Sequence, residues 1–204
     1  FLAAIALFIP LLGTLGYESA LAISIPFAVF ASLIGNCGLK LSSKGGKAPT
    51  SRASLWATWV ASTLASLVSL AGPATVLLVA IPWKPVCNIP RALAWWGLIP
   101  ACAACLCIAI GFSLRKFLNG RTGWITTFFV AFLVLSLLRT LFNLANGPVL
   151  LAYNHFFGYF PGPLYDEVLP VPAGLIYLRL ISIMGAAAIV ATLDAWEKRT
   201  QGRV

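Results

Sequence analysis

Six long apolar runs separated by short polar segments constrain this chain more than any other feature of its sequence. A helix needs about 20 apolar residues to cross the hydrocarbon core of a bilayer. Only 9% of the 204 residues are charged, against about 25% in soluble domains. The sequence therefore predicts one integral membrane domain over residues 1–204, an all-α polytopic bundle of about six transmembrane helices. The predicted spans are residues 1–16, 20–39, 54–81, 91–112, 124–144 and 173–193.

The first run is short for a span and begins at Phe1 with no charged segment ahead of it. No small-residue cleavage site followed by soluble sequence comes after it, so we do not interpret it as a cleaved signal peptide. We therefore expect native residues to precede it.

The basic residues predict the orientation of the bundle. Cytoplasmic loops of multi-pass proteins carry an excess of Lys and Arg. With the N-terminus inside, the outer segments contain only Lys84 and Arg91 as basic residues, and the inner segments contain ten. Those ten are Lys40, Lys44, Lys47, Arg52, Arg115, Lys116, Arg121, Lys198, Arg199 and Arg203. The net charge of +9 is therefore interpreted as a topological signal with both termini cytoplasmic, and not as a nucleic-acid-binding surface.

Two arginines, Arg139 and Arg179, lie inside predicted spans. At about 1.5 Å per residue, both lie roughly 7 to 9 Å below the outer boundary of the membrane. Ser136, Arg139 and Asn143 share one helical face by their spacing, and such a polar face is expected to pack against other helices.

An arginine at that depth is costly unless it is paired or reaches the interface. The acidic residues of the outer segments are Glu18, Asp166 and Glu167. Our main hypothesis is that Arg139 and Arg179 pair with these carboxylates in one polar cluster under the outer surface. In the alternative, each arginine extends separately to lipid phosphates.

The connection at residues 145–172 is long for a compact bundle. It contains six aromatic residues, five prolines and no basic residue, a composition unlike that of a flexible linker. We predict an ordered outer cap over the bundle, with Tyr153 in it. His155, the single histidine, has no second histidine nearby, so a structural role and an acid-base or ligand role both remain open.

Several sequence signatures are absent. No predicted span has an acidic residue at its middle, which a proton or sodium relay would require. There is no HExxH helix, no Gly-rich phosphate loop and no GxSxG turn. Cys102 and Cys105 have CxxC spacing, but they lie within an apolar helix and are interpreted as packed thiols. The sequence therefore predicts no catalytic residue, no metal site and no cofactor.

Three stretches carry a resemblance: residues 15–19 (LGYES), 87–91 (CNIPR) and 158–167 (GYFPGPLYDE). Together they resemble the membrane domain of a poorly characterised family of bacterial polytopic membrane proteins. The resemblance implies a location in the bacterial cytoplasmic membrane and membership of a larger assembly. It implies no activity and no catalytic residue.

Three functions remain open. The first is a non-enzymatic membrane module that binds partner subunits or anchors a larger assembly. The second is a transporter component that binds a small anionic solute under the outer cap through Arg139 and Arg179. The third is a membrane enzyme that uses His155 with Asp166 or Glu167 at the outer interface. We predict the first, with protein partners in the membrane in addition to the lipid bilayer.

Overall fold

The computed structural model describes residues 14–44, 54–83, 86, 88–146, 152–160 and 171–201. Five helical segments in this part of the chain are long and apolar enough to cross a membrane. They are Tyr17–Lys40, Leu55–Val79, Ile89–Phe117, Thr122–Asn146 and Ala173–Thr200. The predicted helical architecture is confirmed, and the five long apolar helices are compatible with a multi-pass membrane protein. The additional span predicted at residues 1–16 lies almost wholly outside the described residues.

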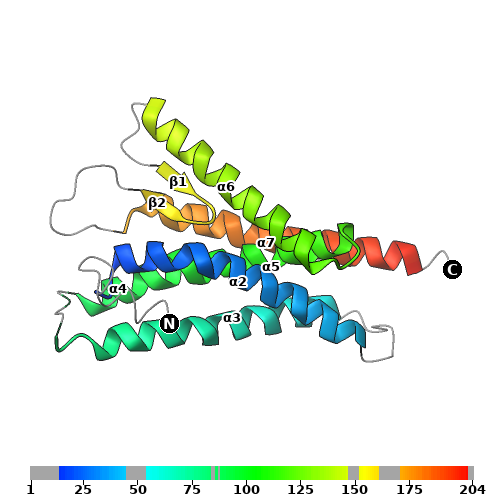
Figure 1. Ribbon diagram of the computed structural model, residues 1–204, viewed down its shortest axis with the longest axis horizontal. Coiled ribbons are helices and arrows are strands. Elements are labelled where there is room, and N and C mark those ends of the chain that lie inside the picture. Colours follow the sequence, from blue (N-terminus) through cyan, green and yellow to red (C-terminus); the bar gives the residue numbers. More distant parts are fainter. Residues whose placement is uncertain are drawn as a thin grey trace.

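The helices run back and forth along one long axis (Figure 1). A two-stranded antiparallel hairpin pairs Ala152 with Phe160, Tyr153 with Tyr159 and Asn154 with Gly158. The elements, in chain order, are α2 (Tyr17–Lys44), α3 (Ser54–Val79), α4 (Ile89–Trp96), the π-helical turn η1 (Gly97–Ala101), α5 (Cys102–Phe117), α6 (Thr122–Asn146), β1 (Ala152–Asn154), β2 (Gly158–Phe160) and α7 (Ala173–Gln201).

Six of the described basic residues, Lys40, Arg115, Lys116, Arg121, Lys198 and Arg199, lie at one end of the bundle, which we call the basic end. There α2, α5 and α7 finish and α6 begins (Figure 1). Arg115 donates to Asn36 Oδ1 at 2.5 Å, and Lys116 forms an ion pair with Glu197 at 2.6 Å. These contacts join α5 to α2 and to α7. The opposite end, where α6 finishes and α7 begins, is called the hairpin end.

Helices α2 and α5 form the centre of the bundle, and glycines let their backbones approach closely. A Cβ atom at Gly111 of α5 would lie 2.7 Å from the carbonyl oxygen of Ser32 on α2. A Cβ atom at Gly35 of α2 would lie 3.0 Å from the carbonyl oxygen of Ile108. Membrane helices associate through such small-residue contacts because lipid offers no hydrophobic force to drive them together.

The span from α4 to α5 contains a π-helical turn around Pro100. Proline has no N–H to continue the α-helical ladder, and a wider turn accommodates this loss. The turn is buried: Ile99 is fully shielded and faces the hairpin at Gly158. η1 therefore forms one wall of the space into which the hairpin fits.

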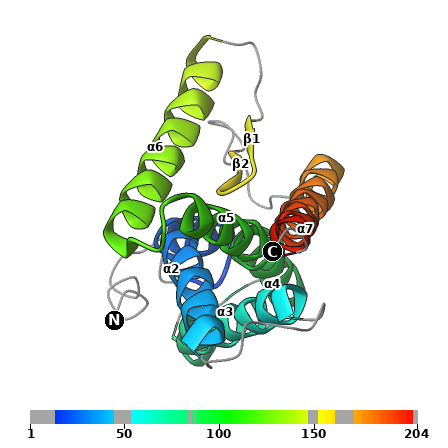
Figure 2. The same cartoon turned by 90° about the vertical axis from the view of Figure 1, so that its right-hand side faces the viewer.

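Helix α6 leans away from the rest of the bundle toward the hairpin end (Figure 1). The hairpin lies between α6 and α7, as the view along the bundle shows (Figure 2). Its turn residues Phe156, Phe157 and Gly158 are buried. The hairpin thus fills the space that opens where α6 and α7 diverge.

Candidate functional site

The turn of the hairpin lies deep within the helices. The ring of Phe156 contacts the rings of Phe129 and Phe132 on α6, with centroid separations of 6.4 and 5.5 Å. At about 1.5 Å per residue, Phe132 is roughly 20 Å along α6 from its hairpin end at Asn146. Non-helical backbone at membrane depth is tolerated when protein buries it. The described part of the predicted outer cap is therefore a hairpin whose turn is buried between the helices (Figure 2).

Asn154 fixes the hairpin to α6. Its amide nitrogen donates to Thr140 Oγ1 at 2.8 Å and to Ser136 Oγ at 2.9 Å. Its amide oxygen accepts from the backbone N–H groups of Phe156 at 2.8 Å and Phe157 at 3.3 Å. One buried side chain therefore both shapes the turn and docks it on the helix.

Arg179 of α7 lies against the same turn and is 1% exposed. Its Nη1 donates to the carbonyl oxygen of His155 at 2.6 Å. Its Nε and Nη2 atoms are buried and have no hydrogen-bond partner among the described residues. Within the same part of the chain, the ion pairs are Lys116–Glu197 and Lys198–Asp194, so no described carboxylate neutralises Arg179. The site is a buried cation with unused donors.

Gly158 makes this close arrangement possible. Its φ angle is +85°, in the left-handed region that glycine adopts without strain. A Cβ atom here would lie 2.9 Å from Arg179 Nη2 and 3.1 Å from Ile99 Cγ1. The absence of a side chain at Gly158 therefore leaves the guanidinium edge uncrowded.

His155 occupies the exposed side of the turn. Its Nδ1 lies 2.8 Å from Ser182 Oγ, and that hydroxyl donates its hydrogen to the carbonyl oxygen of Leu178 at 2.8 Å. The hydroxyl of Ser182 must then accept from Nδ1–H, since it has only one hydrogen. Neutral His155 is accordingly the Nδ1–H tautomer, with an unprotonated Nε2.

We expect acid to destabilise the hairpin through His155. This residue lies in the turn, outside the spanning helices, and partial burial followed by the charge of Arg179 lowers its pKa below the usual value. The unfolded state therefore takes up the proton first, and stability falls as the pH decreases from about 6.5 toward the lowered pKa. The check is the melting temperature in detergent between pH 7.5 and 5.5.

His155→Asn is the matched control for the pH series, because the asparagine amide nitrogen is as many bonds from Cβ as Nδ1, can donate to Ser182 and does not titrate. The pH dependence below about 6.5 should be smaller in this variant. An equal slope in both proteins would contradict the assignment.

The structure brings together two of the residues predicted from the sequence, Arg179 and His155. Tyr153 of β1 is 37% exposed. Its hydroxyl lies beside Gly174 at the start of α7, where a Cβ atom would be 2.7 Å away. Glu18 is partly exposed in the first turn of α2, at the hairpin end. Asp166 and Glu167 lie outside the described residues, so their pairing with arginine remains a hypothesis.

Arg139 and Asn143 are placed differently from Arg179. Both are exposed on α6, although the sequence predicts that their face packs against other helices. The reason is the lean of α6: the hairpin covers its Thr140 side, and Thr140 is buried. Two arginines of similar predicted depth therefore occupy different environments.

Sequence reasoning did not identify Asn154, Thr140 and Gly158 as site residues. The available signal was the stretch Asn154-His-Phe-Phe-Gly158, in which an asparagine that can bond to its own turn is followed by a glycine suited to positive φ. Short strands inside a membrane domain are not expected, so the sequence alone does not favour a hairpin here.

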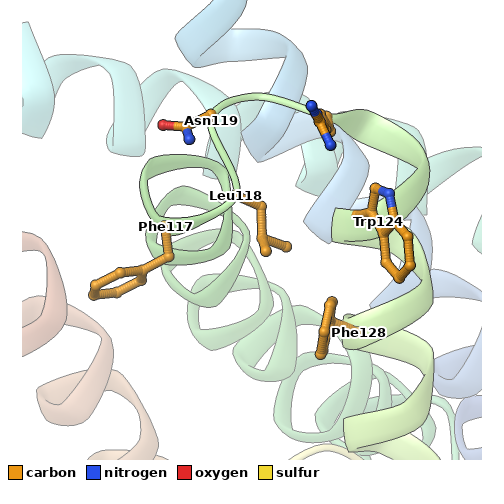
Figure 3. A pocket seen from close by; sticks show the side chains of 6 residues that line it. Phe117, Leu118, Asn119, Trp124 and Phe128 are labelled. Atoms are coloured by element: carbon orange, nitrogen blue, oxygen red, sulfur yellow. The ribbon is translucent and has the colours of Figure 1, made fainter.

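No three His, Cys, Asp or Glu side chains of the described segments lie together in a group suited to a metal ion. A separate, open pocket of about 340 Å³ lies at the basic end, at the turn between α5 and α6 (Figure 3). Its lining residues are Phe117, Leu118, Asn119, Arg121, Trp124 and Phe128. It is far along α6 from the residues that hold Asn154.

Comparison of the chain with protein-family models, with curated proteins and with solved structures finds no match. The class is therefore described from the fold alone: apolar helices that suit a multi-pass membrane protein and that enclose a hairpin and a buried arginine.

Proposed function

We propose that this protein is a non-enzymatic membrane module that binds a partner transmembrane helix along α6. The observation that carries the proposal is Arg139. Its side chain is exposed on α6, and no hydrogen bond or ion pair joins it to another described residue. The neighbouring Leu135, Leu138 and Phe142 are also exposed, so the arginine lies in a lipid-facing surface.

The chemistry of this surface indicates the kind of partner. Arg139 lies about 10 Å along α6 from its hairpin end, where an unpaired charge is unfavourable. A carboxylate on a neighbouring helix would neutralise it, and Asn143, one turn away, can add a hydrogen bond. We therefore infer a partner helix with Asp or Glu at this depth. Extension of Arg139 to lipid phosphate, or its pairing with Asp166 or Glu167, is the competing hypothesis.

The proposed orientation rests on the distribution of charge, and the proposed membrane rests on the resemblance of residues 15–19, 87–91 and 158–167 to a bacterial membrane family. The basic end carries Lys40, Arg115, Lys116, Arg121, Lys198 and Arg199, and such ends face the cytoplasm. We propose a bacterial inner membrane, with the hairpin end outward. In this orientation the partner's carboxylate lies in the outer leaflet.

We expect Arg139→Leu to disrupt the partner contact. Loss of a desolvated charge pair weakens association by at least about tenfold. The measurement is photo-cross-linking in intact membranes from a photoreactive phenylalanine analogue that replaces Leu135, which is 65% exposed on α6. Arg139→Lys should retain part of the cross-linked product, because it keeps the charge.

The same photoreactive residue at Val68, 74% exposed on α3, is the matched control and should give lipid adducts. The cross-linked partner should have Asp or Glu at the site of attachment, and an exchange of the charges between the two chains should restore the product. Products from α6 that contain lipid alone, or that are unchanged in Arg139→Leu, would contradict the proposal.

A second function, the binding of an anion by Arg179, is favoured by the unused donors of that buried side chain and is developed below. The enzyme hypothesis has no comparable support. The imidazole of His155 has Ser182 as its hydrogen-bond partner among the described residues, which is the arrangement of a structural histidine.

A further inference from the structure

We propose that Arg179 binds an oxyanion, a carboxylate or a phosphate, through the unused edge of its guanidinium beneath the hairpin. This inference is independent of the partner helix proposed for α6. It rests on the geometry of one buried side chain and on the turn that encloses it.

The two donors without a partner lie on the same side of the guanidinium. Nη1 donates to the carbonyl oxygen of His155, whereas Nε and Nη2 remain. The N–H of Nε and one N–H of Nη2 point in parallel along this edge. Such a pair matches the two oxygens of a carboxylate or phosphate in a bidentate contact. Nε and Nη2, the two nitrogen atoms without a partner, are thus the donors that a bidentate contact with an oxyanion requires.

Charge and burial both favour occupancy of this edge. Arg179 is 1% exposed, and a buried cation with unmet donors is strongly unfavourable. The titratable groups nearest to its charge in the described part of the chain are His155 and the thiols of Cys102 and Cys107. None of these is a carboxylate. A bound oxyanion would supply the missing negative charge and both acceptors.

Gly158 packs against the free edge of Arg179 without a side chain. A Cβ atom there would lie 2.9 Å from Nη2, so any other residue would crowd the free edge. Because Nε and Nη2 are themselves buried, an anion reaches this edge only when the turn of the hairpin moves aside. The side chain of His155 is exposed while its carbonyl group meets Arg179, so the turn is the part of the enclosure nearest to the surface.

The test is a thermal titration of the full chain in neutral detergent with phosphate, sulfate and acetate at constant ionic strength, with chloride as the reference ion. Binding to the folded state should raise the melting temperature with the logarithm of the anion concentration, on the order of 5 °C at about 100 times the dissociation constant. A parallel titration with phosphatidylglycerol and phosphatidylcholine separates a lipid headgroup from a free anion.

Two substitutions locate the response. Arg179→Gln should abolish it, and Arg179→Lys should weaken binding at least about tenfold, because an ammonium group is a point charge without a fork of donors. The lysine variant keeps the buried positive charge. It therefore provides the comparison with wild type if the glutamine variant does not fold. Arg199→Gln, an exposed position at the other end of α7, is the matched control and should respond as the wild type does.

Stabilisation by phosphatidylglycerol alone would identify the oxyanion as a headgroup and support the proposal. An equal response in wild type and Arg179→Lys, or a response to chloride as large as that to phosphate, would overturn it. A carboxylate of the chain itself is a further possible occupant of the edge. In that case the wild type would give no response and the double variant Asp166→Asn, Glu167→Gln would gain one, and this result would also overturn the proposal.

Discussion

Gly158→Ala is expected to lower the free energy of unfolding by about 2–4 kcal/mol. One part of the loss comes from the backbone, because φ at this position is +85° and an L side chain is strained there. The other part comes from crowding: the new Cβ atom would lie 2.9 Å from Arg179 Nη2 and 3.1 Å from Ile99 Cγ1. The measurement is reversible unfolding in mixed micelles.

Gly120→Ala is a control that measures the loss of stability from backbone strain alone. Gly120 has φ of +72°, and the nearest atom to a Cβ there would be 3.6 Å away, at the flexible end of Arg115. The difference between the two variants therefore measures the crowding at the hairpin. Equal losses at Gly158 and Gly120 would show that the turn yields freely around Arg179.

Asn154→Ala is expected to lower the free energy of unfolding by about 3–5 kcal/mol. The substitution leaves the buried N–H groups of Phe156 and Phe157 without their acceptor, at about 1–3 kcal/mol each. It also removes the donor to Ser136 and Thr140, so the turn loses its hydrogen bonds to α6. Unfolding in mixed micelles gives the energy, and hydrogen exchange at the two phenylalanine amides reports the release of the turn.

Thr140→Val separates these contributions. It removes one acceptor of Asn154 and leaves the internal bonds of the turn intact, so a loss of about 1 kcal/mol is expected. Hydrogen exchange at Phe156 and Phe157 should then remain slow. Fast exchange in Thr140→Val would mean that docking on α6, and not the internal bonds, keeps the turn folded.

The spans were predictable because one property, apolar length, determines them. The run at 54–81 corresponds to α3, which ends at Val79, and the run at 124–144 lies inside α6. The helices extend beyond the predicted ends at several boundaries; α7, for example, continues from 193 to Gln201. Polar residues such as Lys198 can remain helical outside the bilayer, so hydropathy marks the membrane and not the helix.

The site was only partly predictable. A buried environment for Arg179 follows from its small and polar neighbours, since Ser182 lies on the same face. The exposure of Arg139 does not follow from its sequence, because it depends on the lean of α6 and on how far the hairpin covers that helix. The aromatics of the hairpin indicate burial or an interface equally well, and only the three-dimensional arrangement decides between them.

The buried position of the hairpin turn has a consequence for how the chain is assembled. Its polar groups bond to Ser136 and Thr140 on α6, and its turn meets Arg179 and Ser182 on α7. Until α7 has been synthesised and inserted, half of these partners do not exist. The hairpin can therefore complete its hydrogen bonds only after α7 has joined the bundle, which makes its docking a late step of folding.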